Sequence, residues 1–463
     1  MYSLKIILLS GGSGSRLWPL SNPIRSKQFI KILPKNNNEL ESMIQRTYRL
    51  LKEVGLNEET FLTISSDQLE VTKNQLDENV KFIVEPEQGD TFSAISLATL
   101  YLINNKIVSE EDSIVVVPVD AFVDKTFYEN LKKLALHTNF PDVDLALMGV
   151  SAKEPKTEYG YIIPEESSIN DYKHIKKFIE KPDCNTARLL VEKGAFWNCG
   201  VFAFQANTLL RVLKEKNIPN DYFSFLNNYT KMNFKSFDYE VVENLNNIVV
   251  CPYNGTWMDI GNWLNIDKVL SRKVIGKGYL NEKSKNTTLI NTLNIPVMIS
   301  GVTNSIVITS PDGIAVLDKN ESINLKNENP FKFDRIKYEE KRWGYYEVLD
   351  CQKQVNQYVT TKKLYIKEGK NISYQYHNFR NESWTIVKGT GEFVLDGELH
   401  LLGVGDIVKI PKKVKHAIKA NSDLEIVEVQ WGNLVDEKDI VRISINWEEI
   451  LKLQSNQINP ILT

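Results

Sequence analysis

Cysteine and histidine are scarce in this chain of 463 residues, which contains four cysteines and five histidines. Cys184, Cys199, Cys251 and Cys351 lie far apart and form no Cys-x-x-Cys pair, which argues against a disulfide framework or a cysteine zinc site. The first apolar run, Leu4–Leu9, passes directly into glycines and is too short for a signal or membrane helix. These absences predict a cytoplasmic, reduced protein without a membrane segment.

The chain also has little excess charge. Its formal net charge is −3, and no run of lysines and arginines is long enough to bind RNA or a membrane surface. We therefore expect no nucleic-acid or membrane partner. The length and the 42% hydrophobic content are sufficient for two or three domains with cores of their own.

The pattern of apolar residues changes twice along the chain. Up to about residue 270, short β-branched runs alternate with helical patterns, which predicts an α/β, Rossmann-like domain with a mostly parallel sheet. Helical periodicity then disappears, and turn-rich strands predict a small all-β, β-helix-like module, with a polar linker over 326–340. Dense short strands after Trp343 predict a closed β-barrel or jelly roll. The expected domains are 1–270, 271–330 (module and linker) and 331–450.

A glycine-rich loop follows the first predicted strand. Gly11, Gly12 and Gly14 allow backbone N–H groups to approach phosphate oxygens, and Arg16 adds a charged fork suited to phosphate. The loop matches neither G-x-G-x-x-G nor the Walker pattern, which argues against a dehydrogenase or a P-loop ATPase. The glycines alone would equally fit a structural turn.

The residues around this loop favour a phosphate-binding loop over a structural turn. The segment Gly11–Ser21, followed by Ser26-Lys27-Gln28-Phe29, resembles the opening signature of mannose-1-phosphate guanylyltransferases, a branch of the nucleotide-sugar pyrophosphorylases. Further motifs follow in that family's order: Glu85-Pro86 with Asp90–Ile95, Pro118-Val119-Asp120, Glu158–Ile162, Phe178–Pro182, Trp197–Phe202 and Trp257–Trp263.

The predicted reaction is attack of a sugar 1-phosphate on the α-phosphorus of a nucleoside triphosphate, which requires alignment and charge neutralisation. Asp120 and Asp259, at predicted strand ends, are suitable Mg²⁺ ligands, and the resemblance implies the same pair. It also implies that Arg16 and Lys27 bind the triphosphate and act in catalysis. The implied nucleotide-binding residues are Gly11, Gly12, Ser13, Gly14, Ser15, Glu85 and Thr91. The implied sugar-binding residues are Gly160, Glu180, Lys181, Asn198 and Gly200.

Two positions depart from the family pattern. Gln88-Gly89 stands where many of these enzymes have an arginine before the Asn/Asp-Thr pair, and Ala121 stands where a histidine often follows the metal aspartate. The expected substrates are GTP and mannose 1-phosphate. The alternative is another base or another sugar 1-phosphate, which Gln88-Gly89 leaves open.

A second group of candidate ligands lies in the last domain. Gln375 and His377 are two residues apart on a predicted strand, so both side chains should face the barrel interior, and Glu382 and His416 come from neighbouring strands. This mixed oxygen and nitrogen set suits zinc, manganese, iron or cobalt ions. The pattern resembles the cupin fold and the C-terminal phosphomannose-isomerase domain fused to some mannose-1-phosphate guanylyltransferases.

The resemblance implies that Gln375, His377, Glu382 and His416 hold a metal that polarises the sugar during aldose–ketose exchange. Arg380 would then bind the substrate phosphate or stabilise the enediolate. The family's Arg-x-Glu-His-Trp motif reads Arg380-Asn381-Glu382-Ser383-Trp384 here, so one candidate acid/base histidine is absent. The alternative is a non-catalytic barrel used for assembly or sensing. We expect a homo-oligomer, most simply a dimer.

Overall fold

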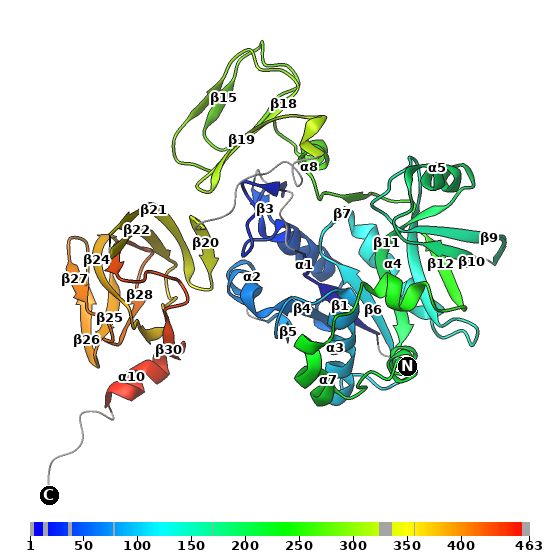
Figure 1. The fold of residues 1–463 in the computed structure, drawn as a ribbon, viewed down its shortest axis with the longest axis horizontal. Coiled ribbons are helices and arrows are strands. Elements are labelled where there is room, and N and C mark those ends of the chain that lie inside the picture. The colour runs from blue at the N-terminus through cyan, green and yellow to red at the C-terminus, as the bar shows by residue number, and fades with distance from the viewer. Residues whose placement is uncertain are drawn as a thin grey trace, which may run out of the picture.

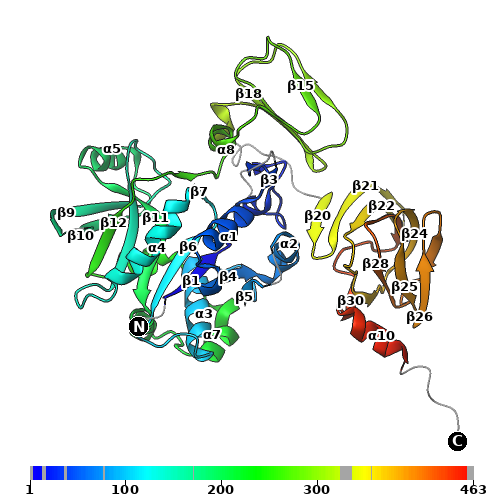
Figure 2. The ribbon, with the colours of Figure 1, turned by 180° about the vertical axis from the view of Figure 1, so that it is seen from behind.

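The computed structural model describes residues 4–12, 17–35, 39–76, 79–169, 171–323, 336–355 and 357–455. The chain forms three parts: a large α/β domain, a narrow β module above it and a separate β-barrel with the C-terminal helix (Figure 1). The view from behind shows the barrel beside the edge of the α/β domain that carries α2 (Figure 2). No described helix is both long and apolar enough to cross a membrane.

The α/β domain is built on one nine-stranded sheet. The neighbours β5, β4, β1 and β6 run parallel, as do β8 and β12, which gives the parallel sheet that the sequence predicts. Strand β11 joins these two groups antiparallel to both, and β10 and β9 extend the far edge. In spatial order the strands are β5 (Lys81–Glu85), β4 (Thr60–Ser65), β1 (Leu4–Leu9), β6 (Ser113–Pro118), β11 (Phe196–Gln205), β8 (Leu145–Ser151), β12 (Ile248–Pro252), β10 (Tyr172–Ile179) and β9 (Tyr161–Ile169).

Helices cover both faces of this sheet, which explains why its strands are continuous apolar runs. In β1, Ile6 and Leu8 belong to one core cluster and Ile7 and Leu9 to the other. The first core includes residues of α1, α4 and α5, and the second includes residues of α3, α6 and α7. These helices are α1 (Met43–Glu53), α3 (Thr91–Asn104), α4 (Lys125–His137), α5 (Cys184–Glu192), α6 (Ala206–Glu215) and α7 (Tyr222–Asn228); the shorter α2 (Leu69–Gln75) lies near the β5 edge.

The β module is a short parallel stack, as the sequence predicts. Strands β14 (Val274–Ile275), β16 (Thr288–Asn291) and β18 (Ser305–Ser310) pair in parallel on one side, and β15 (Gly278–Leu280) pairs with β17 (Val297–Ile299) on another. Strand β19 (Gly313–Asp318) closes the stack antiparallel to β18. Helix α8 (Trp263–Val269) connects it to the α/β domain.

This module supports the segment that follows the glycine-rich loop. Leu17, Trp18 and Leu20 share one apolar cluster with Trp263 of α8 and Ile308 of β18. The Trp263 indole Nε1 also donates to the Trp18 carbonyl at 3.0 Å. The module therefore holds the chain on one side of the loop in place.

The C-terminal part is a barrel of two facing sheets with a core between them, in agreement with the predicted closed β fold. The predicted linker over 326–340 is wrong at its end, because Tyr338–Lys341 pairs with the next strand as part of the barrel; residues 326–335 lie outside the described residues. The tail forms α10 (Trp447–Ser455). One sheet has the order β20 (Tyr338–Lys341), β21 (Gly344–Gln354), β22 (Gln357–Ile366), β29 (Leu424–Gly432), β24 (Arg380–Lys388), β27 (Ile407–Ile410), and the other β26 (Glu398–Leu402), β25 (Gly391–Leu395), β28 (His416–Ala420), β23 (Tyr374–Tyr376), β30 (Val441–Ser444).

Candidate functional sites

The glycine-rich loop begins where β1 ends. Gly12 has a φ of 112°, which favours glycine, and nothing lies within 4 Å of where a Cβ would stand at Gly11 or Gly12. The start of the loop is therefore open to a ligand. Ser13, Gly14, Ser15 and Arg16, which the sequence assigns to the phosphates, lie outside the described residues.

Lys27 brings the two predicted metal aspartates together. Its Nζ lies 2.8 Å from Asp120 Oδ2 and 3.7 Å from Asp259 Oδ1. Burial raises the pKa of Asp120, but the Lys27 ammonium more than offsets this and leaves that pKa below its usual value. Asp120 is therefore charged at neutral pH, and both carboxylates face the Lys27 ammonium.

The backbone explains why residues so far apart in sequence converge. Asp120 follows β6, and the next residues form β7 (Ala121–Val123), which pairs antiparallel with β13 (Trp257–Asp259) so that Asp259 lies opposite Ala121. Gly261 N donates to Asp259 Oδ1 at 2.9 Å and fixes its side chain. Two convergent carboxylates form the hard oxygen set that Mg²⁺ prefers, so these residues fit that ion.

The short helix that carries Lys27 is anchored to the end of β1 through its neighbour Gln28. Lys27 lies in the short 3-10 helix η2 (Lys27–Phe29), and the buried Gln28 donates from Nε2 to the Ser10 carbonyl at the end of β1, at 3.2 Å. This contact ties the Ser26–Phe29 motif to the start of the loop, which the resemblance alone did not explain.

The predicted sugar-binding residues form a second cluster in the same domain, and Gly200 lies beside Pro118, two residues before Asp120. Asn198 N donates to the Gly160 carbonyl at 2.8 Å, and Asn198 Oδ1 accepts from Gly200 N at 3.0 Å. Lys181 Nζ pairs with Glu180 Oε1 at 2.6 Å. A Cβ at Gly160 would lie 2.4 Å from Glu180 Oε2, so this close approach requires glycine.

Sequence reasoning missed one member of this cluster, Asp238. Its Oδ1 accepts from Asn198 Nδ2 at 2.7 Å, and it belongs to a π-helical turn over Asp238–Val242. Burial, together with repulsion from Glu180, raises the pKa of Asp238 to about 7. No spacing in the sequence singles out this residue, because a fold contact brings it to Asn198 from forty positions away.

Glu85 and Thr91 lie near the N-terminus of α3. The Glu85 carboxylate is buried and accepts from the Tyr229 hydroxyl and from Gly89 N, while Thr91 Oγ1 accepts from Phe237 N at 2.8 Å. A Cβ at Gly89 would lie 2.4 Å from Tyr229 Oη. Tyr229 therefore occupies the space beside position 89, which accounts sterically for the glycine there.

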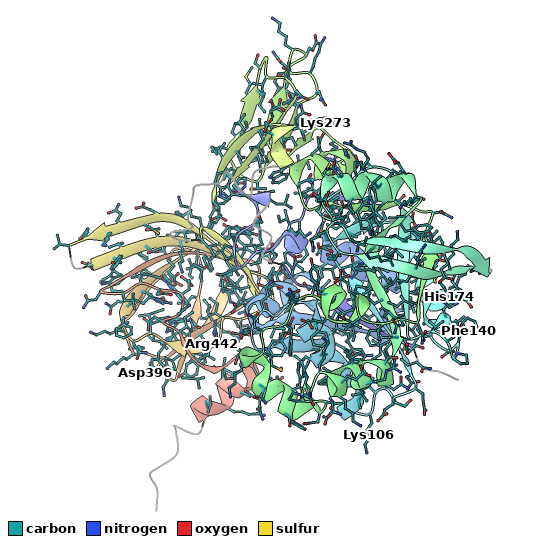
Figure 3. The ribbon with its side chains drawn as sticks, turned by 45° about the vertical axis from the view of Figure 1, so that its right-hand side comes forward. Lys106, Phe140, His174, Lys273, Asp396 and Arg442 are labelled. Carbon is teal, nitrogen blue, oxygen red and sulfur yellow. The ribbon has the colours of Figure 1, made fainter. Side chains whose placement is uncertain are left out.

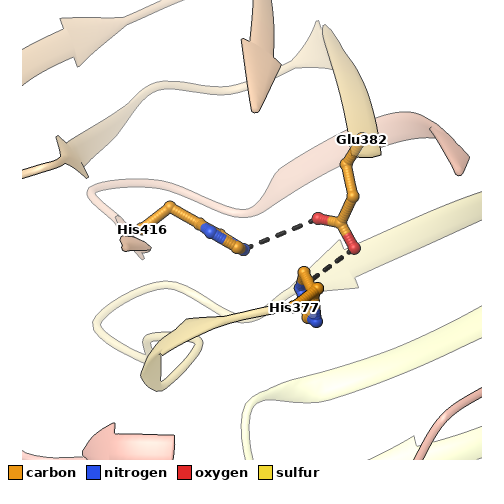
Figure 4. Close-up of side chains that lie close together, drawn as sticks. All are labelled: His377, Glu382 and His416. Carbon is orange, nitrogen blue, oxygen red and sulfur yellow. Dashed lines mark ion pairs between the residues drawn. The ribbon is translucent and has the colours of Figure 1, made fainter. Parts of the chain in front are cut away.

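The barrel brings His377, Glu382 and His416 together, with potential ligand atoms within 4.8 Å of one another (Figure 4). His377 Nε2 lies 3.1 Å from Glu382 Oε1, and His416 Nε2 lies 3.5 Å from Glu382 Oε2. The Nδ1 atom of His377 contacts the Asp439 carbonyl and that of His416 the Val414 carbonyl. This arrangement turns both Nε2 atoms inward as metal ligands usually require.

Among the described residues, two buried polar atoms in this cluster lack a partner that a bound metal ion would supply. Within the described ranges, Glu382 Oε2 and His416 Nε2 are buried and have no hydrogen-bond partner. Burial lowers the pKa of His416 to about 4, which keeps it neutral, whereas the two histidines and Arg380 lower that of Glu382 despite its burial. A carboxylate beside two imidazole nitrogens fits a divalent cation.

The remaining predicted residues of the barrel, Gln375 and Arg380, line a cavity together with Glu382. Gln375 is buried and lies opposite His416 in the β23–β28 pairing. Arg380 is 2% exposed; its Nε donates to Glu382 Oε1 at 2.9 Å and its Nη1 to the Asp436 carbonyl at 2.6 Å. Arg380 therefore positions a candidate metal ligand, an arrangement that the sequence did not indicate.

Alternation along β24 decides where position 383 points. Arg380, Glu382 and Trp384 are buried and line the cavity, whereas Ser383 lies between them on the other side of the strand and does not. A histidine at this position would also face away from the cavity.

Sequence reasoning missed Glu428, a buried carboxyl group that accepts hydrogen bonds from Trp384 Nε1 and Gln430 Nε2. Burial and the nearby charge of Glu382 raise the pKa of Glu428 to about 8.

Two carboxylates and a lysine lie beyond the strand ends of an α/β sheet, and a barrel with a candidate metal site follows. Together they define the class of a nucleotide-processing enzyme with an appended cupin-like domain. The chain belongs to the nucleotidyl transferase family, whose model matches residues 5–272. The model described as mannose-6-phosphate isomerase C-terminal matches residues 326–445.

Similar proteins span nearly the whole chain. A Salmonella montevideo protein named mannose-1-phosphate guanylyltransferase is 28% identical over 95% of this chain and 98% of its own length. The Pseudomonas syringae alginate biosynthesis protein AlgA is 28% identical over 94% of this chain and 95% of its own. A Thermus thermophilus crystal structure described as a mannose-1-phosphate geranyltransferase shares the fold, with a TM-score of 0.60 and 24% identity over 70% of this chain and 97% of that one.

Proposed function

We propose that this enzyme is a mannose-1-phosphate guanylyltransferase, which converts GTP and mannose 1-phosphate into GDP-mannose and pyrophosphate. The observation that carries the proposal is the convergence of Lys27, Asp120 and Asp259 beside the open start of the glycine-rich loop. The choice of substrates is supported by full-length relatives with this printed name.

In the proposed reaction, a phosphate oxygen of mannose 1-phosphate attacks the α-phosphorus of GTP. The bond between that phosphorus and the bridging oxygen breaks, and pyrophosphate leaves with the electron pair. Bound Mg²⁺ would neutralise charge on the phosphates. Lys27 would stabilise the departing pyrophosphate, and Arg16 is assigned the same task from the sequence.

We assign Gly160, Glu180, Lys181, Asn198 and Gly200 to the sugar phosphate. The Glu180 carboxylate would accept from sugar hydroxyls, and the half-exposed Lys181 ammonium, which pairs with Glu180, would bind the phosphate. Glu85 and Thr91, with the loop residues Gly11–Ser15, are assigned to the nucleotide. Because Tyr229 binds Glu85 and takes the space beside Gly89, base recognition here would differ from that of relatives with an arginine at this point.

The test is pyrophosphate release measured over a matrix of nucleoside triphosphates and sugar 1-phosphates with Mg²⁺. We expect the highest kcat/KM with GTP and mannose 1-phosphate. Release with a different pair and none with this one would replace the substrates but keep the reaction. Release with no pair would remove the nucleotidyltransferase function.

For the barrel we propose mannose 6-phosphate isomerisation with a divalent transition metal on His377, Glu382, His416 and Gln375. The inward Nε2 atoms and the unpartnered Glu382 Oε2 support this second activity, and the outward direction of Ser383 removes the objection that the sequence raised. The test is conversion of mannose 6-phosphate to fructose 6-phosphate by the metal-loaded protein. Metal binding without conversion would favour a barrel used for assembly or sensing.

We further propose the division into domains 1–270, 271–330 and 331–450. A cytoplasmic location is supported by the four cysteines, all of which are free thiols. The expected homodimer is checked by light scattering on the purified protein.

A further inference from the structure

A cavity of about 250 Å³ opens where the barrel meets the α/β domain. Its barrel side includes Gln375, Glu382 and Arg380, so it leads to the candidate metal ligands. Its other side is formed by Ser66, Leu69 and Glu70, which lie in and just before α2. The entrance to the barrel's site is thus shared by two domains.

Five basic side chains line this cavity, and three of them are neutralised within the protein. Arg380 is bonded to Glu382 and to backbone carbonyls, Lys362 pairs with Glu437, and Lys341 pairs with Glu339. The charges of these three side chains are already paired within the protein, so they are poor candidates for binding a ligand.

The other two cations are Arg342 and Arg442. Arg342 Nε lies 3.9 Å from Glu70 Oε1, too long for a hydrogen bond, and the Arg442 side chain makes no hydrogen bond or ion pair with any residue that the structure describes. Arg442 comes from β30, directly opposite Gln375 in the β23–β30 pairing, and lies on the side of the barrel that faces the α/β domain (Figure 3).

The two arginines repel each other. Burial lowers the pKa of Arg342, and the positive charge of Arg442 lowers it further, whereas Glu70 opposes this. A dianionic phosphate would relieve this repulsion, and the planar guanidinium fork matches its oxygens. If the phosphate of a phosphorylated sugar bound here, its sugar ring would extend along the cavity toward Gln375 and the candidate metal ligand Glu382.

We propose that Arg342 and Arg442 form the phosphate-binding subsite of the barrel cavity, and that Glu70 of the nucleotidyltransferase domain competes with the phosphate for it. The ligand is the phosphate group of a phosphorylated sugar. The assignment rests on the proposed isomerase site for the identity of that sugar, but not for the binding of phosphate itself. Arg380, by contrast, acts on Glu382 and not on the phosphate.

The test uses the full chain loaded with metal. Binding of inorganic phosphate and of mannose 6-phosphate is measured by calorimetry for the wild type, Arg342→Gln, Arg442→Gln and Glu70→Gln. Arg188→Gln, an exposed arginine of α5, is the control. We expect each cavity arginine variant to weaken both ligands about tenfold or more, Glu70→Gln to tighten them severalfold, and the control to match the wild type. Thermal unfolding identifies any variant that has lost its fold, and Arg342→Lys and Arg442→Lys then replace it.

The outcomes separate the two proposals. If the wild type isomerises mannose 6-phosphate, the arginine variants should raise KM far more than they lower kcat. If it does not, arginine-dependent phosphate binding still supports the subsite while the isomerase proposal fails. Wild-type affinity for phosphate in both folded arginine variants would overturn the subsite.

Discussion

Gln75 of α2 and Glu340 of the barrel are joined across the domain boundary by a hydrogen bond of 3.0 Å from Nε2 to Oε2. The same Gln75 amide donates to the Phe29 carbonyl at 2.8 Å, two residues from Lys27. Lys31 adds an ion pair to Glu340 at 3.1 Å. One buried side chain of the barrel therefore contacts the segment that carries the candidate catalytic lysine.

Replacing Glu340 should destabilise the whole molecule. The carboxylate is 6% exposed, and Glu340→Ala leaves the buried Gln75 amide and the Lys31 ammonium without this partner. We expect a loss of about 1–3 kcal/mol, measured by chemical denaturation. Glu39→Ala, which removes an exposed pair with Lys35, is the control and should change little. Equal effects of the two substitutions would contradict the role of Glu340.

Asp259→Asn should abolish most nucleotidyl transfer without unfolding the protein. The amide oxygen can still accept from Gly261 N, but one of the two converging charges is lost. We expect kcat to fall by roughly 100-fold or more at an unchanged melting temperature. Asp142→Asn, at an exposed position, serves as the control. Near-normal turnover would remove Asp259 from the proposed Mg²⁺ site.

Gly89→Ala should disturb the contact between Tyr229 and Glu85. The added methyl group would lie 2.4 Å from Tyr229 Oη, so the ring must move away from the carboxylate. We expect a loss of about 1–3 kcal/mol and a changed KM for the nucleotide. Gly403→Ala, where the nearest atom is 3.9 Å away, is the matched control. An unchanged KM for the nucleotide would argue against Glu85 as a nucleotide contact.

Asp238 should make stability depend on pH. Its pKa rises to about 7 in the folded protein, from about 4 in the unfolded chain, so the folded state holds its proton more tightly. The stabilisation is complete below pH 4 and is lost as the pH rises through 7. Asp238→Asn should therefore become steadily more stable relative to the wild type between pH 4 and 7, by up to about 4 kcal/mol, and the difference should stay constant above that.

Urea unfolding of both proteins at several pH values between 4 and 8.5 checks this prediction. A stability difference that does not vary with pH would show that Asp238 is ionised throughout. Asp221→Asn is the control for sign, because hydrogen bonds at the start of α7 lower the pKa of that exposed carboxylate. Asp221→Asn should be less stable than the wild type at neutral pH, and this difference should shrink on acidification.

Metal content should depend on the buried histidines of the barrel and not on its exposed histidine. His377→Ala removes an inward Nε2 atom that lies 3.1 Å from Glu382, and we expect it to abolish bound transition metal. His400→Ala, an exposed histidine of the same domain, should retain it. The measurement is the transition-metal content of the two variants and the wild type, purified under identical conditions. Equal metal content in both variants would place the ion elsewhere.

The sequence by itself determined the fold class, the succession of α/β domain, β stack and barrel, and the local motifs. These follow from short-range patterns: apolar runs covered on both faces, turn-rich strands, and glycines at a strand end. Through the family resemblance it also named His377, Glu382 and His416, which the barrel brings together.

Only the tertiary structure decided which groups act on one another across long distances in the chain. Asp238 reaches Asn198, Tyr229 takes the space beside Gly89, and Glu340 meets Gln75 through pairings that no local pattern contains. Strand alternation turned Ser383 away from the cavity, and domain packing put Glu70 beside Arg342. The physical reason is that burial and charge at a site are properties of the assembled neighbours, whereas sequence spacing records only what the backbone brings together within one or two elements.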